Sequence, residues 1–149
     1  MPKKRKHRKL TLSEYVRRRN GLPLGASGSM RNMFERSLGA GTFGSFWEYW
    51  NPIFGYTLGT YVYRPLQAFV PMSLALVITF VVNGAIHDLV TTIARGSIAF
   101  LFTPLFFLLG LGVLVGKFAR IDFSKHPWHL RAGFNLFYLG ICLALTIAF

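Results

Sequence analysis

Three long uncharged segments fill most of the second half of the chain and limit what it can fold into. They cover 68–86, 96–116 and 132–149, with nineteen, twenty-one and eighteen residues. A helix needs roughly 20 apolar residues to cross about 30 Å of hydrocarbon. We therefore expect an all-α membrane protein whose three transmembrane helices, over about 68–90, 96–116 and 132–149, form a region 68–149.

The overall composition also favours lipid over water as the main solvent. The chain is 52% hydrophobic and only 15% charged, whereas a soluble domain usually has about a quarter of its residues charged. Pro71 should lie near the start of the first spanning helix. Pro104 falls inside the second and should kink it, which membrane helices tolerate.

Positive charge is concentrated at the N-terminal end. Residues 1–36 carry eleven basic and two acidic side chains, a net of +9 out of the +12 of the whole chain. We expect 1–36 to be a largely extended cytoplasmic arm that attracts anionic lipid headgroups, interrupted by one short helix from Thr11 to Arg19. The residues expected to bind the membrane surface or a partner are Lys3, Lys4, Arg5, Lys6, Arg8, Lys9, Arg17, Arg18 and Arg19. No stacking aromatics accompany the arm, so no specific nucleic-acid binding is predicted.

Residues 37–67 are dense in aromatic side chains, which favour the headgroup level of a membrane. The aromatic residues include Phe46, Trp47, Tyr49, Trp50, Phe54, Tyr56, Tyr61 and Tyr63. Pro52, Gly55 and Gly59 argue against one long regular helix. We expect an interfacial or partly inserted segment, made of two short helices.

The distribution of basic residues between loops predicts the topology. The arm and the loop 117–131 hold nearly all the positive charge, whereas the loop 91–95 holds only Arg95. The positive-inside rule places the N-terminus and the loop 117–131 in the cytoplasm, and the C-terminus on the opposite side.

A polar stripe runs along the first apolar segment. Thr79, Asn83, His87 and Thr91 recur every four residues, a spacing that places them on one face of a helix. Polar groups in a membrane usually face a bundle interior or a wet cavity. His87 is a candidate general base, because imidazole titrates near neutral pH. The alternative is a histidine at the membrane interface beside Asp88, on a helix that packs through its polar stripe.

The aromatic segment carries a motif. Residues 46–51 (FWEYWN) resemble the Phe-aromatic-x-x-Trp-Asn motif of the membrane-bound O-acyltransferases, closest to the sterol and diacylglycerol acyltransferase branch. Residues 61–66 (YVYRPL) are similar to the tyrosine-rich stretch and basic-Pro pair downstream in that family. The interval of 36 residues from Asn51 to His87 also suits it. The likeness covers about 34–149 and corresponds to the C-terminal part of the family only.

The resemblance implies the roles of several residues. His87 would activate an acceptor hydroxyl, Asn51 would orient the substrate or stabilise an oxyanion, and the donor would be an acyl thioester such as acyl-CoA. Trp47 and Trp50 would line the site, and Asn83 and Thr79 would contact substrate from the stripe. No other cofactor is implied.

Two hypotheses follow. Family members have some eight or more spanning segments, and this chain has about three. It can be a small non-catalytic subunit of a larger membrane complex, with lipid and other membrane subunits as partners. Alternatively it is an O-acyltransferase that uses His87 and Asn51.

Metal chemistry is not predicted. His126 and His129 flank Pro127-Trp128, but two ligands are too few for a zinc site. Cys142 is the only cysteine and lies in an apolar segment, so we expect a small packing residue.

Overall fold

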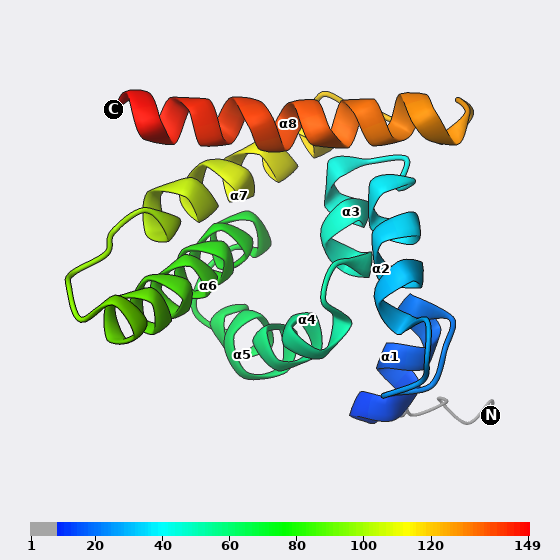
Figure 1. The fold of residues 1–149 in the computed structure, drawn as a ribbon, viewed down its shortest axis with the longest axis horizontal. Helices are drawn as coiled ribbons and strands as arrows, with labels where there is room; N and C mark the ends of the chain where they lie inside the picture. Colours follow the sequence, from blue (N-terminus) through cyan, green and yellow to red (C-terminus); the bar gives the residue numbers. More distant parts are fainter. Residues whose placement is uncertain (1–8) are drawn as a thin grey trace, which may run out of the picture.

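The computed structural model describes residues 9–149, and this part of the chain is all-α. Figure 1 shows α8 along one side of the molecule, α1 to α3 at one end, α6 and α7 at the other, and α4 and α5 on the side opposite α8. In chain order the elements are α1 (Leu12–Asn20), α2 (Ser29–Leu38), α3 (Phe43–Tyr49), α4 (Pro52–Leu58), the π-helical turn η1 (Gly59–Tyr63), α5 (Arg64–Leu66), α6 (Met72–Arg95), α7 (Phe102–Phe118) and α8 (Trp128–Ala148).

The short helix predicted after Thr11 is present as α1. Thr11 caps it, since its Oγ1 accepts from the Glu14 amide at 3.3 Å while Glu14 Oε2 accepts from the Thr11 amide at 2.9 Å. This reciprocal pair satisfies two amides that have no partner within the helix. Gly21, at φ 88°, ends α1 in the left-handed conformation that glycine adopts without steric cost.

The expectation of a largely extended arm over 1–36 is wrong for its described part. A second helix, α2, follows α1, and both bury an apolar side chain, Val16 and Met33 respectively. α1 packs against α2 and α4. Charge density alone predicted an extended chain, but the helix caps and these buried side chains favour helix. Residues 1–8, which include Lys3, Lys4, Arg5, Lys6 and Arg8, lie outside the described residues.

The aromatic segment forms short helices, with breaks at 39–42 and at 50–51. α3 ends at Tyr49, and α4 starts at Pro52, where the missing proline N–H costs nothing at the first helical position. As expected, this segment forms no single long regular helix: α4 starts at Pro52 and gives way at Gly59 to η1, which leads into α5, whereas Gly55 lies inside α4. Gly59 only widens the turn into π geometry.

Two of the three apolar helices are long and apolar enough to cross a membrane by length and composition. They are α6, with 24 residues, and α8, with 21, whereas α7 has only 17. The predicted start of the middle helix at Gly96 is wrong, since α7 begins at Phe102 after a loop. The predicted kink at Pro104 is therefore also wrong: Pro104 lies in the first turn of α7, where a missing N–H breaks no helical hydrogen bond.

α8 begins at Trp128 rather than Ala132 and fastens α2 to the apolar helices. Trp128 Nε1 donates to the Glu35 carbonyl at 2.9 Å. Asn135 is fully buried, and its Nδ2 donates to the carbonyls of Leu38 and Ala40, both at 2.9 Å. These acceptors lie at the C-terminal end of α2, where carbonyls lack helical partners. The basic N-terminal helices are thus fixed to the apolar part of the fold.

The core is aromatic and joins the two halves of the chain. Phe43 and Phe46 of α3 are only 2% and 1% exposed. They pack with Phe106, Leu109 and Val113 of α7 and with Cys142 of α8. This packing presses residues 46–51 against α6 and α7 and so positions the site described next.

Candidate functional site

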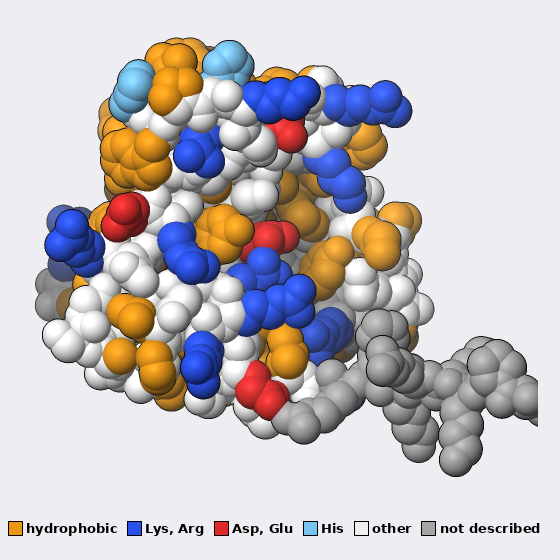
Figure 2. Space-filling view, turned by 90° about the vertical axis from the view of Figure 1, so that its right-hand side faces the viewer, with side chains coloured by type: hydrophobic (Ala, Val, Ile, Leu, Met, Phe, Trp, Pro, Cys, Tyr) orange, Lys and Arg blue, Asp and Glu red, His pale blue; other side chains and the backbone are white. Residues whose placement is uncertain are grey.

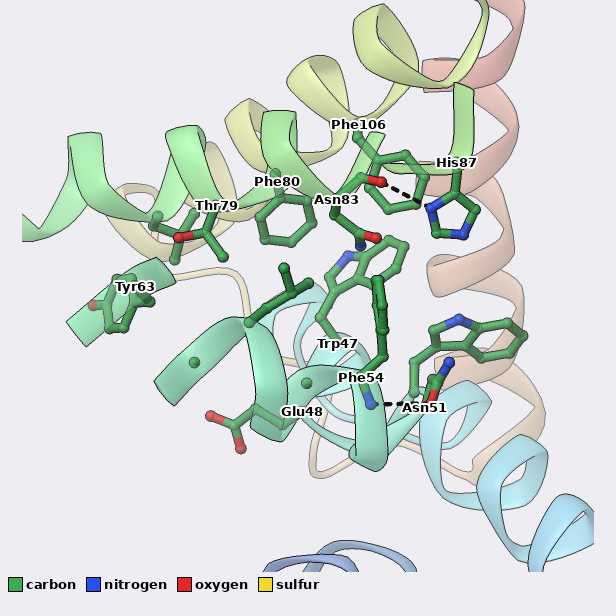
Figure 3. Close-up of a pocket in the computed structure, with 15 residues that line it drawn as sticks. Trp47, Glu48, Asn51, Phe54, Tyr63, Thr79, Phe80, Asn83, His87 and Phe106 are labelled. Atoms are coloured by element: carbon green, nitrogen blue, oxygen red, sulfur yellow. Dashed lines mark hydrogen bonds between the residues drawn. The ribbon is translucent and has the colours of Figure 1, made fainter. Parts of the chain in front are cut away.

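A cavity of about 340 Å³ lies between the aromatic segment and α6. Its lining residues are Trp47, Glu48, Trp50, Asn51, Phe54, Gly55, Leu58, Gly59, Tyr63, Leu76, Thr79, Phe80, Asn83, His87 and Phe106. The set includes all six residues that the sequence suggested for catalysis or substrate binding. The structure therefore brings the FWEYWN segment and the polar stripe of α6 to one place (Figure 3).

His87 is held by its own helix and by aromatic rings. Its Nδ1 lies 2.8 Å from the backbone carbonyl oxygen of Asn83. A carbonyl only accepts, so Nδ1 is the donor in this contact, and the tautomer that the contact favours has its lone pair on Nε2. The ring stacks on Phe106 with centroids 5.1 Å apart and meets the Phe54 ring edge-on at 6.0 Å. These contacts hold the imidazole in one orientation.

Asn51 lines the cavity but already has a structural task. It lies between α3 and α4 at φ 41°, a left-handed conformation that asparagine tolerates better than most residues. Its Oδ1 accepts from the Phe54 amide at 3.3 Å and so caps α4. The Asn-Pro pair in the sequence was a signal for this cap. The Asn51 side chain is also exposed, and only its Nδ2 remains available as a donor.

The other polar side chains of the stripe bond mainly within α6. The Thr79 hydroxyl donates to the Ala75 carbonyl at 2.7 Å, and the Thr91 hydroxyl to the His87 carbonyl at 2.8 Å. Such bonds satisfy hydroxyl groups in an apolar environment without another helix. Thr79, Asn83 and His87 line the cavity, whereas Thr91 does not.

Asp88 has a role that the sequence did not reveal. It is 6% exposed, and Oδ1 accepts from the amides of Leu101 and Phe102 at 2.9 and 2.8 Å. Oδ2 accepts from the amide and hydroxyl of Thr103 at 2.7 and 2.6 Å. The carboxylate thus caps the N-terminus of α7, where negative charge is stabilised. Both oxygens face α7, so Asp88 serves helix packing.

Two residues that line the cavity each have a buried side-chain atom with no hydrogen-bond partner among residues 9–149. These atoms are Trp47 Nε1, a donor, and Asn83 Oδ1, an acceptor. Neither follows from sequence, because residue type does not tell which side-chain atoms lack a partner after folding. Atoms of the same kind occur at Arg19, Asn20, Arg131 and Asn135, but none of these residues lines the cavity.

A second cavity, of about 670 Å³, adjoins the first. The two share Trp47, Glu48, Gly55, Leu76 and Phe80. The second also reaches Lys117 in the last turn of α7 and Arg120 just after it. Glu48 forms an ion pair with Arg19 of α1 at 2.6 Å. Partial burial lowers the pKa of the Arg19 guanidinium, but the charges of Glu48 and Tyr15 outweigh it and raise the pKa overall.

Basic side chains gather on the face around α1 and α2. Figure 2 shows Lys and Arg spread over this face, with fewer acidic groups among them. Lys9, Arg17 and Arg18 are exposed, and Arg19 is partly buried in its ion pair. This face has the charge that anionic headgroups attract.

Histidine side chains form no metal cluster among residues 9–149. No group of three or more His, Cys, Asp or Glu residues there has the proximity that a metal needs. Instead, the His126 ring packs against Phe123 with centroids 5.5 Å apart.

A scan of protein-family models, a search of curated proteins and a search of solved structures each found no match to this chain. The site is therefore interpreted from its own geometry.

Proposed function

We propose that this chain is a membrane-embedded O-acyltransferase of the kind its FWEYWN motif resembles. One observation carries the proposal. His87 lines a cavity together with Asn51, and its Nδ1 is bonded to a carbonyl, which leaves Nε2 free to take a proton. Asn51 of the motif and His87 lie 36 residues apart in the sequence. Their position in one cavity therefore depends on tertiary packing and not on closeness in the sequence.

The proposed reaction transfers an acyl group from a thioester to an alcohol. His87 Nε2 takes the proton of the alcohol hydroxyl while the alcohol oxygen attacks the carbonyl carbon of the thioester. The tetrahedral intermediate collapses, the carbon–sulfur bond breaks, and the thiolate leaves with the proton from His87. An ester and a free thiol result. A base of this kind typically contributes roughly 10²–10⁴-fold to the rate.

The same proposal includes the membrane arrangement. α6, α7 and α8 cross the bilayer, the aromatic helices lie at the interface, and α1 and α2 bind anionic headgroups on the cytoplasmic side. At 1.5 Å per residue, the 17 residues of α7 extend about 25 Å, slightly less than the roughly 30 Å of hydrocarbon. Local thinning of the bilayer accommodates such a mismatch. The C-terminus lies on the opposite side.

A non-catalytic role as a small subunit of a membrane complex is the second candidate. The observation that favours it is the large apolar surface of α8, where Phe137 and Ile147 are 64% and 70% exposed. Three apolar helices do not enclose a long acyl chain on all sides. Lipid or partner helices then complete the wall of the cavity, and a partner that supplied its own base would make His87 dispensable.

The experiment reconstitutes the full chain in liposomes with palmitoyl-CoA and a panel of alcohols, and it measures release of the free thiol. We expect alcohol-dependent release that falls by roughly 10²-fold or more in His87→Gln. The matched control is Thr91→Val, one turn further along the same stripe but outside the cavity, which keeps the rate. Equal rates for wild type and His87→Gln contradict the proposal.

Gentle extraction from the native membrane separates the two candidates. A complex of fixed stoichiometry in which His87→Gln leaves all activity intact supports the subunit role. A chain that purifies alone and releases thiol supports the enzyme.

A further inference from the structure

The starting observation is a donor that folding has buried and left unpaired. Trp47 Nε1 has no hydrogen-bond partner, although a buried polar group without a partner costs about 1–3 kcal/mol. Native folds pair the great majority of such groups. The exceptions point to a missing partner, and this one lines the cavity that also contains His87.

The surrounding rings fix Trp47 close to His87. The Trp47 ring meets Phe80 edge-on with centroids 5.3 Å apart and lies 5.8 Å from the Phe106 ring. Phe106 in turn stacks on His87 at 5.1 Å. Figure 3 shows the Trp47 indole amid Phe80, Asn83 and Phe106, below His87. A ligand that reaches His87 therefore passes within the space that Trp47 lines.

Asn51 is less suited to serve as a donor. Its amide plane is oriented by the bond from the Phe54 amide to Oδ1, but its side chain is exposed to water. A hydrogen bond to a developing charge is stronger where water is excluded and the donor is already oriented. Buried Trp47 Nε1 meets both conditions.

We infer that Trp47 Nε1–H donates the hydrogen bond that holds the carbonyl oxygen of the bound acyl group and stabilises its negative charge when the hydroxyl attacks. The inference rests on the proposed acyl transfer and assigns the oxyanion role to Trp47 in place of Asn51. The ligand is a fatty acyl ester or thioester, since a largely apolar cavity beside a buried unpaired donor fits an apolar chain with a single carbonyl.

The first test needs no turnover. The full chain is labelled with ¹⁵N at its indole nitrogens, of which three tryptophans give three resonances, and is studied in dodecyl maltoside, a detergent without a carbonyl. Methyl laurate is the probe and dodecane its matched control. We expect methyl laurate to move the Trp47 N–H resonance downfield and dodecane to leave it in place. Equal responses to the two probes overturn the inference.

Assignment and folding are controlled by variants. Trp47→Phe removes one resonance, and if that variant does not fold, Trp50→Phe and Trp128→Phe assign the signal by elimination. Asn83→Ala tests an internal partner. A Trp47 resonance that moves upfield in Asn83→Ala without ligand, and ignores methyl laurate in the wild type, shows a bond to Asn83 and overturns the inference.

Kinetics provide the second test. Trp47→Phe keeps the ring but loses the donor, so kcat falls by roughly 10²-fold, while KM changes by less. Asn51→Ala lowers kcat less than Trp47→Phe; the reverse order overturns the inference. The two failures are distinguishable. If thiol release is absent but methyl laurate moves the Trp47 resonance, acyl transfer fails and carbonyl binding by Trp47 stands.

Discussion

Asn83 and Asp88, two polar residues five positions apart on α6, differ in the hydrogen bonds that their side chains make in the folded protein. Asp88 accepts four hydrogen bonds from the start of α7, so both of its oxygens are used inside the protein. Asn83 lies on the cavity, and its side-chain oxygen has no partner. One residue completes a contact between helices. The other, like Trp47 with its Nε1, has a buried polar atom without a partner among the described residues.

The difference separates structural from functional polarity in an apolar protein. A buried charge is retained for packing only when its hydrogen bonds are complete, as at Asp88. A polar atom that stays buried and unpaired beside a cavity lowers stability rather than raising it. Substitutions at the two kinds of position should therefore affect different measurements.

The largest effect is expected for Asp88→Ala. The change leaves the amides of Leu101, Phe102 and Thr103 without their acceptor at a buried helix start. We expect a loss of about 3–5 kcal/mol in the free energy of unfolding, measured by thermal unfolding in dodecyl maltoside. Asp122→Ala is the control, since that exposed carboxylate bonds only to Ser124. Similar unfolding temperatures for the two variants contradict the structural role of Asp88.

A smaller effect is expected for Gly84→Ala, one turn before Asp88. An added Cβ would lie 2.5 Å from the Phe102 carbonyl oxygen and 2.7 Å from the Thr103 Cα, and these backbone atoms cannot move aside. We expect a loss of about 1–3 kcal/mol in stability from overpacking. Gly133→Ala on α8 is the matched control, because nothing lies within 4 Å of its added Cβ. A Gly84→Ala protein as stable as Gly133→Ala means that α6 and α7 do not approach this closely.

No loss of stability is expected for Asn83→Leu. Among the described residues its side-chain oxygen has no partner to lose, and a buried polar group without a partner costs about 1–3 kcal/mol. The free energy of unfolding should therefore stay the same or rise. The measurement is the same thermal unfolding series. A loss comparable to that of Asp88→Ala would show that Asn83 is bonded in the protein, and the contrast between the two residues would disappear.

Local sequence features predicted much of the secondary structure. The apolar segments gave the region of α6, α7 and α8, because helix formation over such lengths depends on nearby residues. The short helix after Thr11 was predicted for the same reason, since the cap that starts it joins Thr11 to Glu14, only three residues away. Errors arose where a residue distant in the sequence determines the start of a helix. The start of α7 is an example, since Asp88 caps it from thirteen to fifteen residues away.

The candidate site was predicted only as far as periodicity reaches. A four-residue repeat places Thr79, Asn83 and His87 on one face whatever the rest of the chain does. This face contacts the FWEYWN segment, which is consistent with the resemblance. The contact depends on the packing of Phe43 and Phe46 against α7. Which atoms there remain unpaired could not be predicted at all.

The sequence by itself determined an all-α chain with long apolar helices, a basic N-terminal end and a polar stripe on one helix, because these depend on runs and spacings of neighbouring residues. Only the tertiary structure decided that α8 holds α2, through bonds between residues 93 to 97 positions apart. It likewise decided that Asp88 is used for packing and that Trp47 Nε1 is left unpaired. Such contacts depend on where distant segments meet, which no local pattern specifies.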